Sequence, residues 1–178
     1  MKEAVNRLAI RVLVPADAAA FQRLRLEALL DTPAAFLASH DEERQTPLAE
    51  VARRLEQRPG AAVIGAFDGD TLMGIVGLGR EARAKVAHKG HVWGMYVHPS
   101  ARGRGAARDL MRAVLALARE TPGMAKLDLV ADSTNAAAIA LYASLGFVEY
   151  GRERDAIRLD GEPRDDVLMA LHFGGARP

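Results

Sequence analysis

The chain has 178 residues, of which 49% are hydrophobic and 26% are charged, and these values are typical of a globular domain with a proper core. Its formal net charge of +1 provides no general attraction to nucleic acid or to an anionic membrane. The absence of cysteine excludes disulfides, thiol nucleophiles and cysteine-based zinc sites. We expect one domain over residues 1–178, with no nucleic-acid or membrane partner and no metal.

The distribution of charged residues predicts where the protein resides. Lys2, Glu3, Arg7 and Arg11 interrupt every apolar run near the start, so no signal peptide is predicted. The longest uncharged stretch, 133–148, is too short and too polar to span a bilayer. The sequence therefore predicts a cytoplasmic protein. It leaves the oligomeric state open, a homodimer included.

The first half of the chain predicts a strand, two helices and a β-hairpin. Asp17 is a suitable N-cap for the first helix, and Pro59-Gly60 ends the second. Asp68-Gly69-Asp70, between two β-rich runs, is a strong hairpin signal. The expected elements are a strand at Leu8–Val14, a helix from Asp17 to about Leu30, a loop at Asp31–Thr46, a helix at about Leu48–Arg58, and strands at Ala61–Phe67 and Thr71–Gly79.

The second half alternates strands with helices. Asp132-Ser133-Thr134 offers N-cap candidates for the second helix of this half, and Gly146 is its expected stop. The expected elements are a strand at His91–Val97, a helix at Ala106–Glu120, a strand at Lys126–Ala131, a helix ending at about Leu145, and strands at Phe147–Arg154 and Asp165–Phe173 around Asp160-Gly161. Paired strands followed by a β-α-β-α-β order predict a mixed sheet flanked by helices.

A glycine-rich loop, Arg102-Gly103-Arg104-Gly105-Ala106-Ala107, connects a predicted strand to a predicted helix. Glycines let the backbone approach a ligand closely, and the helix directs its unpaired N–H groups and positive dipole end at the loop. This arrangement is typical of a phosphate or pyrophosphate site. Arg102, Arg104 and Arg108 cluster at the helix start, where cations are normally unfavourable, and a bound polyanion would remove that conflict.

A second motif lies one β-α unit later. Asn135 and Tyr142 are seven residues apart, which places them on one face of the predicted helix, two turns from each other. Leu145-Gly146-Phe147 ends that helix and starts the next strand. Taken alone, Asn135 is ordinarily a helix cap and a helical tyrosine is ordinarily a core residue. Their occurrence after the glycine-rich loop favours a shared site.

With these two motifs the chain resembles the GNAT superfamily of acetyl-CoA-dependent N-acetyltransferases. The loop fits the family's Arg/Gln-x-x-Gly-x-Gly/Ala pattern after a strand, and residues 135–147 fit its Asn-x-x-Ala-x-x-Leu-Tyr-x-x-x-Gly-Phe pattern. The resemblance implies an α/β (α+β) fold with a mixed, mostly antiparallel central sheet and helices on both faces. It also implies transfer of acetyl from acetyl-CoA to a small-molecule or peptide amine by direct attack, without an acyl-enzyme.

The resemblance also implies roles for individual residues. The backbone N–H groups of the loop 102–107 would hold the pyrophosphate of CoA, and Asn135 would hydrogen-bond the pantetheine arm. Met95, Tyr96 and Val97 would pair with that arm, and a backbone N–H there would polarise the acetyl carbonyl. Tyr142 would place its hydroxyl near the CoA sulfur, where a neutral phenol can protonate the departing thiolate.

The group that takes a proton from the acceptor amine is left open by the sequence. Glu43 lies in the loop where the family builds its acceptor wall, and His91 shares one strand face with Trp93. Against these roles, Asp41-Glu42-Glu43 is equally a solvated acidic run, and His91 is equally a surface residue at a strand end. An ordered water is a further candidate. If the acidic run faces the site, it favours a cationic acceptor.

Other ligand classes fit the sequence less well. A Rossmann dinucleotide site needs a third glycine where residue 108 is arginine, and a P-loop needs a Gly-Lys-Ser/Thr run that the loop lacks. A non-catalytic domain that senses CoA or a nucleotide with the same fold remains an alternative, and Tyr142 argues against it.

Overall fold

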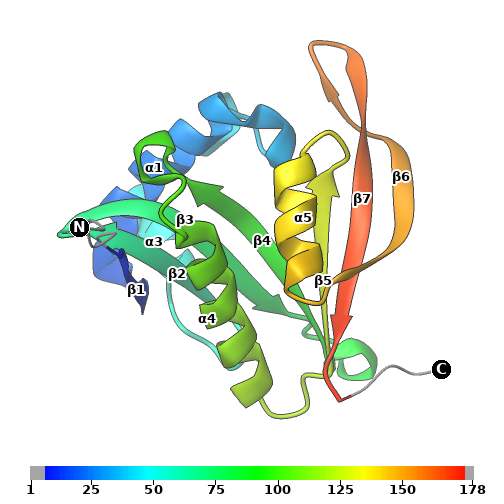
Figure 1. The fold of residues 1–178 in the computed structure, drawn as a ribbon. Coiled ribbons are helices and arrows are strands. Elements are labelled where there is room, and N and C mark those ends of the chain that lie inside the picture. The colour runs from blue at the N-terminus through cyan, green and yellow to red at the C-terminus, as the bar shows by residue number, and fades with distance from the viewer. Residues whose placement is uncertain (1–6, 175–178) are drawn as a thin grey trace, which may run out of the picture.

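The structure of the protein is a computed structural model, in which residues 7–174 are described (Figure 1). Seven strands form one sheet in the order β1-β2-β3-β4-β5-β7-β6. Neighbouring strands are antiparallel except β4 and β5, which are parallel. The strands are β1 (Ala9–Val12), β2 (Ala62–Asp68), β3 (Thr71–Arg80), β4 (Lys89–Val97), β5 (Lys126–Asp132), β6 (Val148–Leu159) and β7 (Glu162–His172).

Five α-helices and several 3-10 turns connect the strands within the described residues. The helices are α1 (Ala18–Asp31), α2 (His40–Glu43), α3 (Leu48–Arg54), α4 (Ala106–Glu120) and α5 (Ala136–Ser144), and the 3-10 turns are Pro15–Asp17, Pro33–Ala35, Ala84–Val86 and Pro99–Ala101. None of these helices, over residues 7–174, is long and apolar enough to cross a membrane.

The observed elements confirm the predicted order and correct some bounds. The segment predicted as a loop at Asp31–Thr46 contains α2, whose single turn is fixed by a capping box between Ser39 and Glu42. Strand β6 continues past its predicted end because an irregular pairing near Asp155, whose φ is +52°, lets it resume pairing with β7. Helix α3 stops earlier than predicted.

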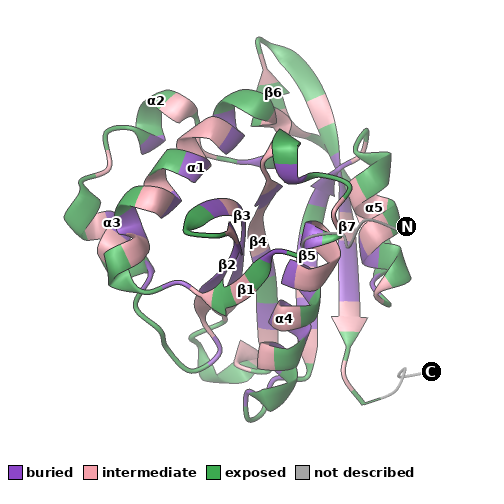
Figure 2. Cartoon of the chain, turned by 60° about the vertical axis from the view of Figure 1, so that its left-hand side comes forward, coloured by how far each residue is buried: buried purple, intermediate pink, exposed green. Residues whose placement is uncertain are grey.

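Two hydrophobic clusters cover the two faces of the sheet, with α1 and α3 on one face and α4 and α5 on the other (Figure 2). The predicted apolar faces of the helices are buried in them: Phe21, Leu24 and Ala28 on α1, and Leu110, Met111, Val114, Leu115 and Ala118 on α4. The mixed, mostly antiparallel sheet with helices on both faces is therefore confirmed. We refer to these faces as the α1 face and the α4 face.

Strands β4 and β5 pair only at their beginnings. The paired residues are Lys89 with Lys126, Gly90 with Leu127 and His91 with Asp128. Beyond them the strands separate, as Figure 1 shows, and no strand pairing joins 92–97 to 129–132. Strand pairing is therefore interrupted in the middle of the sheet, and we refer to this interruption between β4 and β5 as the opening.

Candidate active site

The glycine-rich loop leads into an uncapped helix. Gly103 and Gly105 have φ values of +77° and +82°, a left-handed conformation that side chains rarely adopt. Gly105 is the N-cap of α4 and no side chain caps it, so the N–H groups of the first helical turn lack helical partners. A Cβ placed on either glycine would meet nothing within 4 Å, so this backbone faces open space. These features fit a phosphate group.

Two of the three arginines near this loop are balanced by carboxylates. Arg102 forms an ion pair with Asp31 and also donates from Nε to the carbonyl of Val97 at 3.0 Å. Arg104 pairs with Asp68, with 2.6 Å between Nη1 and Oδ2. For Arg102 and Arg104, carboxylates of the chain thus already balance the charges that we expected a bound polyanion to balance. The ion pairs link the loop to Asp31 at the end of α1 and to Asp68 in the β2–β3 hairpin.

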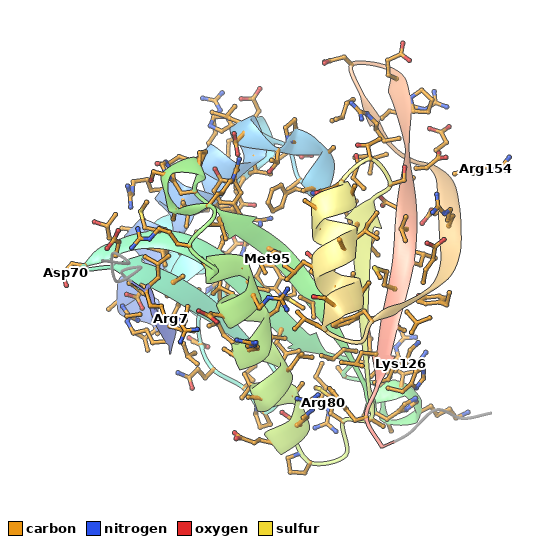
Figure 3. The ribbon with its side chains drawn as sticks, in the orientation of Figure 1. Arg7, Asp70, Arg80, Met95, Lys126 and Arg154 are labelled. Atoms are coloured by element: carbon orange, nitrogen blue, oxygen red, sulfur yellow. The ribbon has the colours of Figure 1, made fainter. Side chains whose placement is uncertain are left out.

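The wall of the opening on β4 has an irregular backbone. Ile75 of β3 pairs with Tyr96, whereas Gly77 pairs with Trp93, so two β4 residues lie opposite a single β3 residue. One of the two is Gly94, whose φ is +64°. The other is Met95, which Figure 3 labels between α4 and α5. The bulge lies where β4 no longer pairs with β5, so the main-chain groups of β4 on the β5 side have no strand partners there.

Tyr96 lies in this wall but its hydroxyl is already engaged. The side chain is 4% exposed and forms a hydrogen bond with Asp31. Burial, and secondly the charge of Asp31, raises the pKa of Tyr96 to about 12. The side chain of Tyr96 is thus held by Asp31 next to Arg102, and backbone contacts of Met95, Tyr96 and Val97 with a cofactor stay a prediction.

Asn135 and Tyr142 lie on α5. Asn135, and none of the predicted candidates in 132–134, is the N-cap, accepting from the N–H of Ala138 at 3.1 Å. Tyr142 is 6% exposed and packs edge-to-face on Phe147, with 6.1 Å between ring centroids. Burial raises the pKa of Tyr142 to about 12, so the phenol is protonated and can donate at neutral pH.

Glu43 is buried between two arginines, and the interpretation of it as part of a solvated run is wrong. Its carboxylate is 3.2 Å from Nε of Arg25 and 2.7 Å from Nη1 of Arg54. The Arg25 guanidinium lies 5.4 Å from the ring centre of Phe36 and 6.0 Å from that of Trp93. Arg25 Nη1 would be 3.5 Å from a Cβ on Gly94, so Glu43 connects to the β4 bulge through Arg25.

His91 lies at the closed end of the opening, where β4 and β5 still pair. It is about half exposed and its Nδ1 is 3.8 Å from Glu81. Met95 is four positions further along the chain, and because the bulge adds one residue to β4, about three strand steps, or roughly 10 Å, separate the two residues. The structure therefore does not bring His91 together with the bulge.

Comparison with protein-family models matches residues 22–147 to the acetyltransferase (GNAT) family. The chain belongs to the GNAT family. N-alpha-acetyltransferase RimI of Mycobacterium tuberculosis is 38% identical over 99 residues, which are 55% of this chain and 59% of that protein. Mycothiol acetyltransferase of Salinispora tropica is 33% identical over 127 residues, 70% of this chain and 41% of that protein. The matches thus span less than two thirds of either relative's own length.

A solved GNAT structure extends the similarity over the whole fold. The structure of yncA from Salmonella typhimurium, which was determined with its cofactor acetyl-CoA, is 26% identical to this chain. It superposes with a TM-score of 0.78 and covers 97% of this chain and 98% of its own. The mixed α/β fold with its open sheet is therefore that of the GNAT family.

Two buried carboxylates of this GNAT chain were not among the candidate site residues predicted from the sequence. Asp132 on β5 and Asp166 on β7 are direct register partners and are 6% and 8% exposed. Asp132 was a cap candidate, and its Oδ1 indeed accepts from the N–H of Thr134 at 2.7 Å. Asp166 belongs to no sequence motif. It comes next to Asp132 only through the pairing of β5 with β7, two strands that are far apart in the sequence.

Proposed function

We propose that the protein transfers the acetyl group of acetyl-CoA to an amine by direct attack, in the opening between β4 and β5. The observation that carries the proposal is the uncapped start of α4 beside that opening, with a protonated tyrosine on α5. The family supports acetyl-CoA as co-substrate, and the relatives' names support an acetyltransferase. The proposal keeps the expected cytoplasmic location.

The chain offers matching groups along the length of acetyl-CoA. The backbone of Gly103, Gly105, Ala106 and Ala107 would hold the pyrophosphate, which is attracted by the N–H groups and dipole of a 15-residue helix. Arg104 would contribute its backbone N–H group, whereas the N–H group of Arg102 donates to the carbonyl of Pro99 at 3.2 Å, so Arg102 would support the loop through its ion pair. The backbone of Met95, Tyr96 and Val97, which has no strand partner on the β5 side, and the amide of Asn135 would contact the pantetheine arm. Acetyl-CoA supplies the activated acyl group.

Tyr142 would act on the leaving sulfur. A phenol with its pKa raised to about 12 keeps its proton at neutral pH and can give it to a thiolate as the carbon–sulfur bond breaks. Direct attack by the amine agrees with a chain that has no cysteine to form an acyl-thioester.

We assign Glu43 a positioning role. Its two ion pairs occupy both carboxylate oxygens. Glu43 would therefore hold the Arg25 guanidinium against the rings of Phe36 and Trp93, next to the bulge. Because two arginines surround this one carboxylate, Glu43 does not give its surroundings a negative charge. The acidic run Asp41-Glu42-Glu43 therefore no longer favours a cationic acceptor. His91 would remain a surface residue paired with Glu81.

The acceptor is proposed as a small-molecule or peptide amine. One relative is named as an N-alpha-acetyltransferase and another as a mycothiol acetyltransferase, so relatives with similar sequences differ in acceptor. An assay of CoA release over a panel of amines and short peptides, combined with acetyl-CoA thermal shift, tests the proposal. Turnover with any amine supports it. A thermal shift without turnover over the whole panel favours the CoA-sensing alternative.

A further inference from the structure

The two faces of the sheet opening have different surroundings. The loop 102–107, Met95 and Tyr142 belong to the α4 face, where Ala106 and Tyr142 lie in one hydrophobic cluster. If acetyl-CoA occupies that side, the acceptor amine has to approach the acetyl carbon from the α1 face. This step rests on the proposed function. The amine would then contact side chains that β5 and its neighbouring strands present on the α1 face.

A row of carboxylates stands on that face. Leu129 and Ala131 of β5 and Val167 of β7 pack in the α4-side cluster, so strand alternation places Asp132 and Asp166 on the opposite, α1 face. Glu153 of β6 is the register partner of Asp166 and extends the row to a third strand. Asp132, Asp166 and Glu153 therefore lie side by side across β5, β7 and β6.

The row is level with the bulge across the opening. The last parallel pair is His91 with Asp128. Asp132 lies four residues further along β5. Because the bulge adds one residue to β4, Tyr96, directly after Met95, lies at the matching height on β4, where the acetyl group is proposed to bind. Asp132 is thus the carboxylate nearest the reacting centre on the β5 side.

These carboxylates are uncompensated. Over residues 7–174, no ion pair joins Asp132, Asp166 or Glu153 to a lysine or arginine. Oδ2 of Asp132 is buried and has no hydrogen-bond partner. A buried polar atom without a partner is costly unless a ligand satisfies it.

The charges that shift the pKa of Asp166 are all negative. Burial, and secondly the charges of Asp132, Glu153 and Asp165, raise the pKa of Asp166. The turn 33–35, which contacts β5 and β6 on this side, carries no charge. Among residues 7–174, no group of three or more carboxylate or histidine side chains is arranged to hold a metal ion.

We propose that Asp132 and Asp166 bind the acceptor amine in its ammonium form and that Asp166 accepts its proton. The preferred acceptor is a primary amine without a carboxylate on the adjacent carbon, because such a carboxylate would be repelled by the row. An amino-acid amide or a peptide N-terminus has this chemistry.

In the proposed reaction the nitrogen of the ammonium loses two protons, one carbon–nitrogen bond forms and one carbon–sulfur bond breaks. The ammonium gives one proton to Asp166, and the nitrogen lone pair forms the carbon–nitrogen bond to the acetyl carbonyl carbon. The carbon–sulfur bond breaks and the sulfur takes the proton of Tyr142. The second proton of the nitrogen passes through solvent to the Tyr142 phenolate. Asp166 then releases its proton to solvent, so each turnover yields an amide, CoA thiol and one proton.

The test compares Asp166→Asn and Asp132→Asn with Asp165→Asn in the full chain. Asp165 is the neighbouring, exposed carboxylate on the other face of β7, so its substitution removes one charge that acts on Asp166 but leaves both carboxylates of the row in place. CoA release is measured from pH 5 to 9 with a panel of primary amines, each paired with its α-carboxylate form, beginning with alanine amide and alanine. Acetyl-CoA binding is followed by thermal shift.

We expect kcat/KM for the amide to fall by about 10²-fold or more in both row variants and to stay unchanged in Asp165→Asn. Asp166→Asn should also lose the acidic limb of the kcat/KM profile, while the acetyl-CoA thermal shift is retained. Wild-type turnover with an unchanged Asp166→Asn profile, or equal use of alanine and alanine amide, would overturn the inference alone. A wild type that binds acetyl-CoA and acetylates no amine would overturn the proposed function as well.

Discussion

Arg25 of α1 and Glu43 of α2 form an ion pair that is largely shielded from solvent, with 3.2 Å between Nε and Oε2. Glu43 is shared with Arg54, so one carboxylate serves two guanidinium groups. Removing it leaves the Arg25 cation buried without a counter-charge, which is costly. The pair links the first helices to Trp93 and to the β4 bulge.

We therefore expect Glu43→Gln to lower stability by about 1–3 kcal/mol, less than for a fully buried pair because Arg54 is partly exposed. The measurement is chemical denaturation, with Asp41→Asn on the exposed end of α2 as the control that should stay near wild type. The pH profile of kcat/KM should keep its shape, since Glu43 is not the proton acceptor. A shifted acidic limb in Glu43→Gln would return Glu43 to that role.

Asp166→Asn should leave the protein as stable as wild type or more stable at neutral pH. The pKa of Asp166 is raised in the folded state, so its linkage contribution is fully present below the unfolded pKa and is lost as pH rises through the folded pKa. The amide removes this loss. Melting temperatures at pH 4 and pH 7 should therefore differ less in the variant than in wild type. A lower melting temperature of the variant at pH 7 would contradict the uncompensated burial of this carboxylate.

Gly105→Val should abolish the stabilisation by acetyl-CoA. At a hundred times the dissociation constant the ligand adds about 2.7 kcal/mol to wild-type stability, and the valine places a side chain where the phosphates approach. The backbone strain of this change is matched by Gly161→Val, because Gly161 has φ +84° and equally open surroundings. Both variants should melt earlier without ligand, and only Gly161→Val should keep the acetyl-CoA shift. A full shift in Gly105→Val would place the cofactor elsewhere.

Tyr142→Phe should reduce kcat by roughly 10²–10⁴-fold with little change in acetyl-CoA affinity. The phenylalanine keeps the packing on Phe147 and removes only the hydroxyl. Tyr150→Phe is the matched control, since Tyr150 is 59% exposed on β6. A wild-type kcat for Tyr142→Phe, in an assay limited by chemistry, would make Tyr142 a core residue only.

Local patterns in the sequence were sufficient for most of the fold. Helix α4 was predicted with the bounds it has, because its apolar residues recur at helical spacing and glycine marks its start. The four-residue α2 was missed since one turn is too short to show a period. The two motifs that we assign to the cofactor could be recognised because each is contiguous in the chain.

Relationships between distant residues could not be predicted. Arg102 and Asp31 are 71 positions apart, so the partner that neutralises the loop arginine emerges only when α1 packs beside β4. The Asp132–Asp166 pair depends on the register of β5 with β7, which no local pattern specifies. The burial of Glu43 was hidden for the same reason, because its two arginines come from other helices.

Single-turnover transfer from acetyl-CoA carrying a labelled acetyl group, followed by mass spectrometry of protein and acceptor, tests acetyl transfer most directly. We expect the label to pass to the amine with one equivalent of CoA released, while the mass of the protein stays unchanged throughout. Bound acetyl-CoA that remains intact with every amine, or label that appears on the protein first, would contradict direct transfer in the opening between β4 and β5.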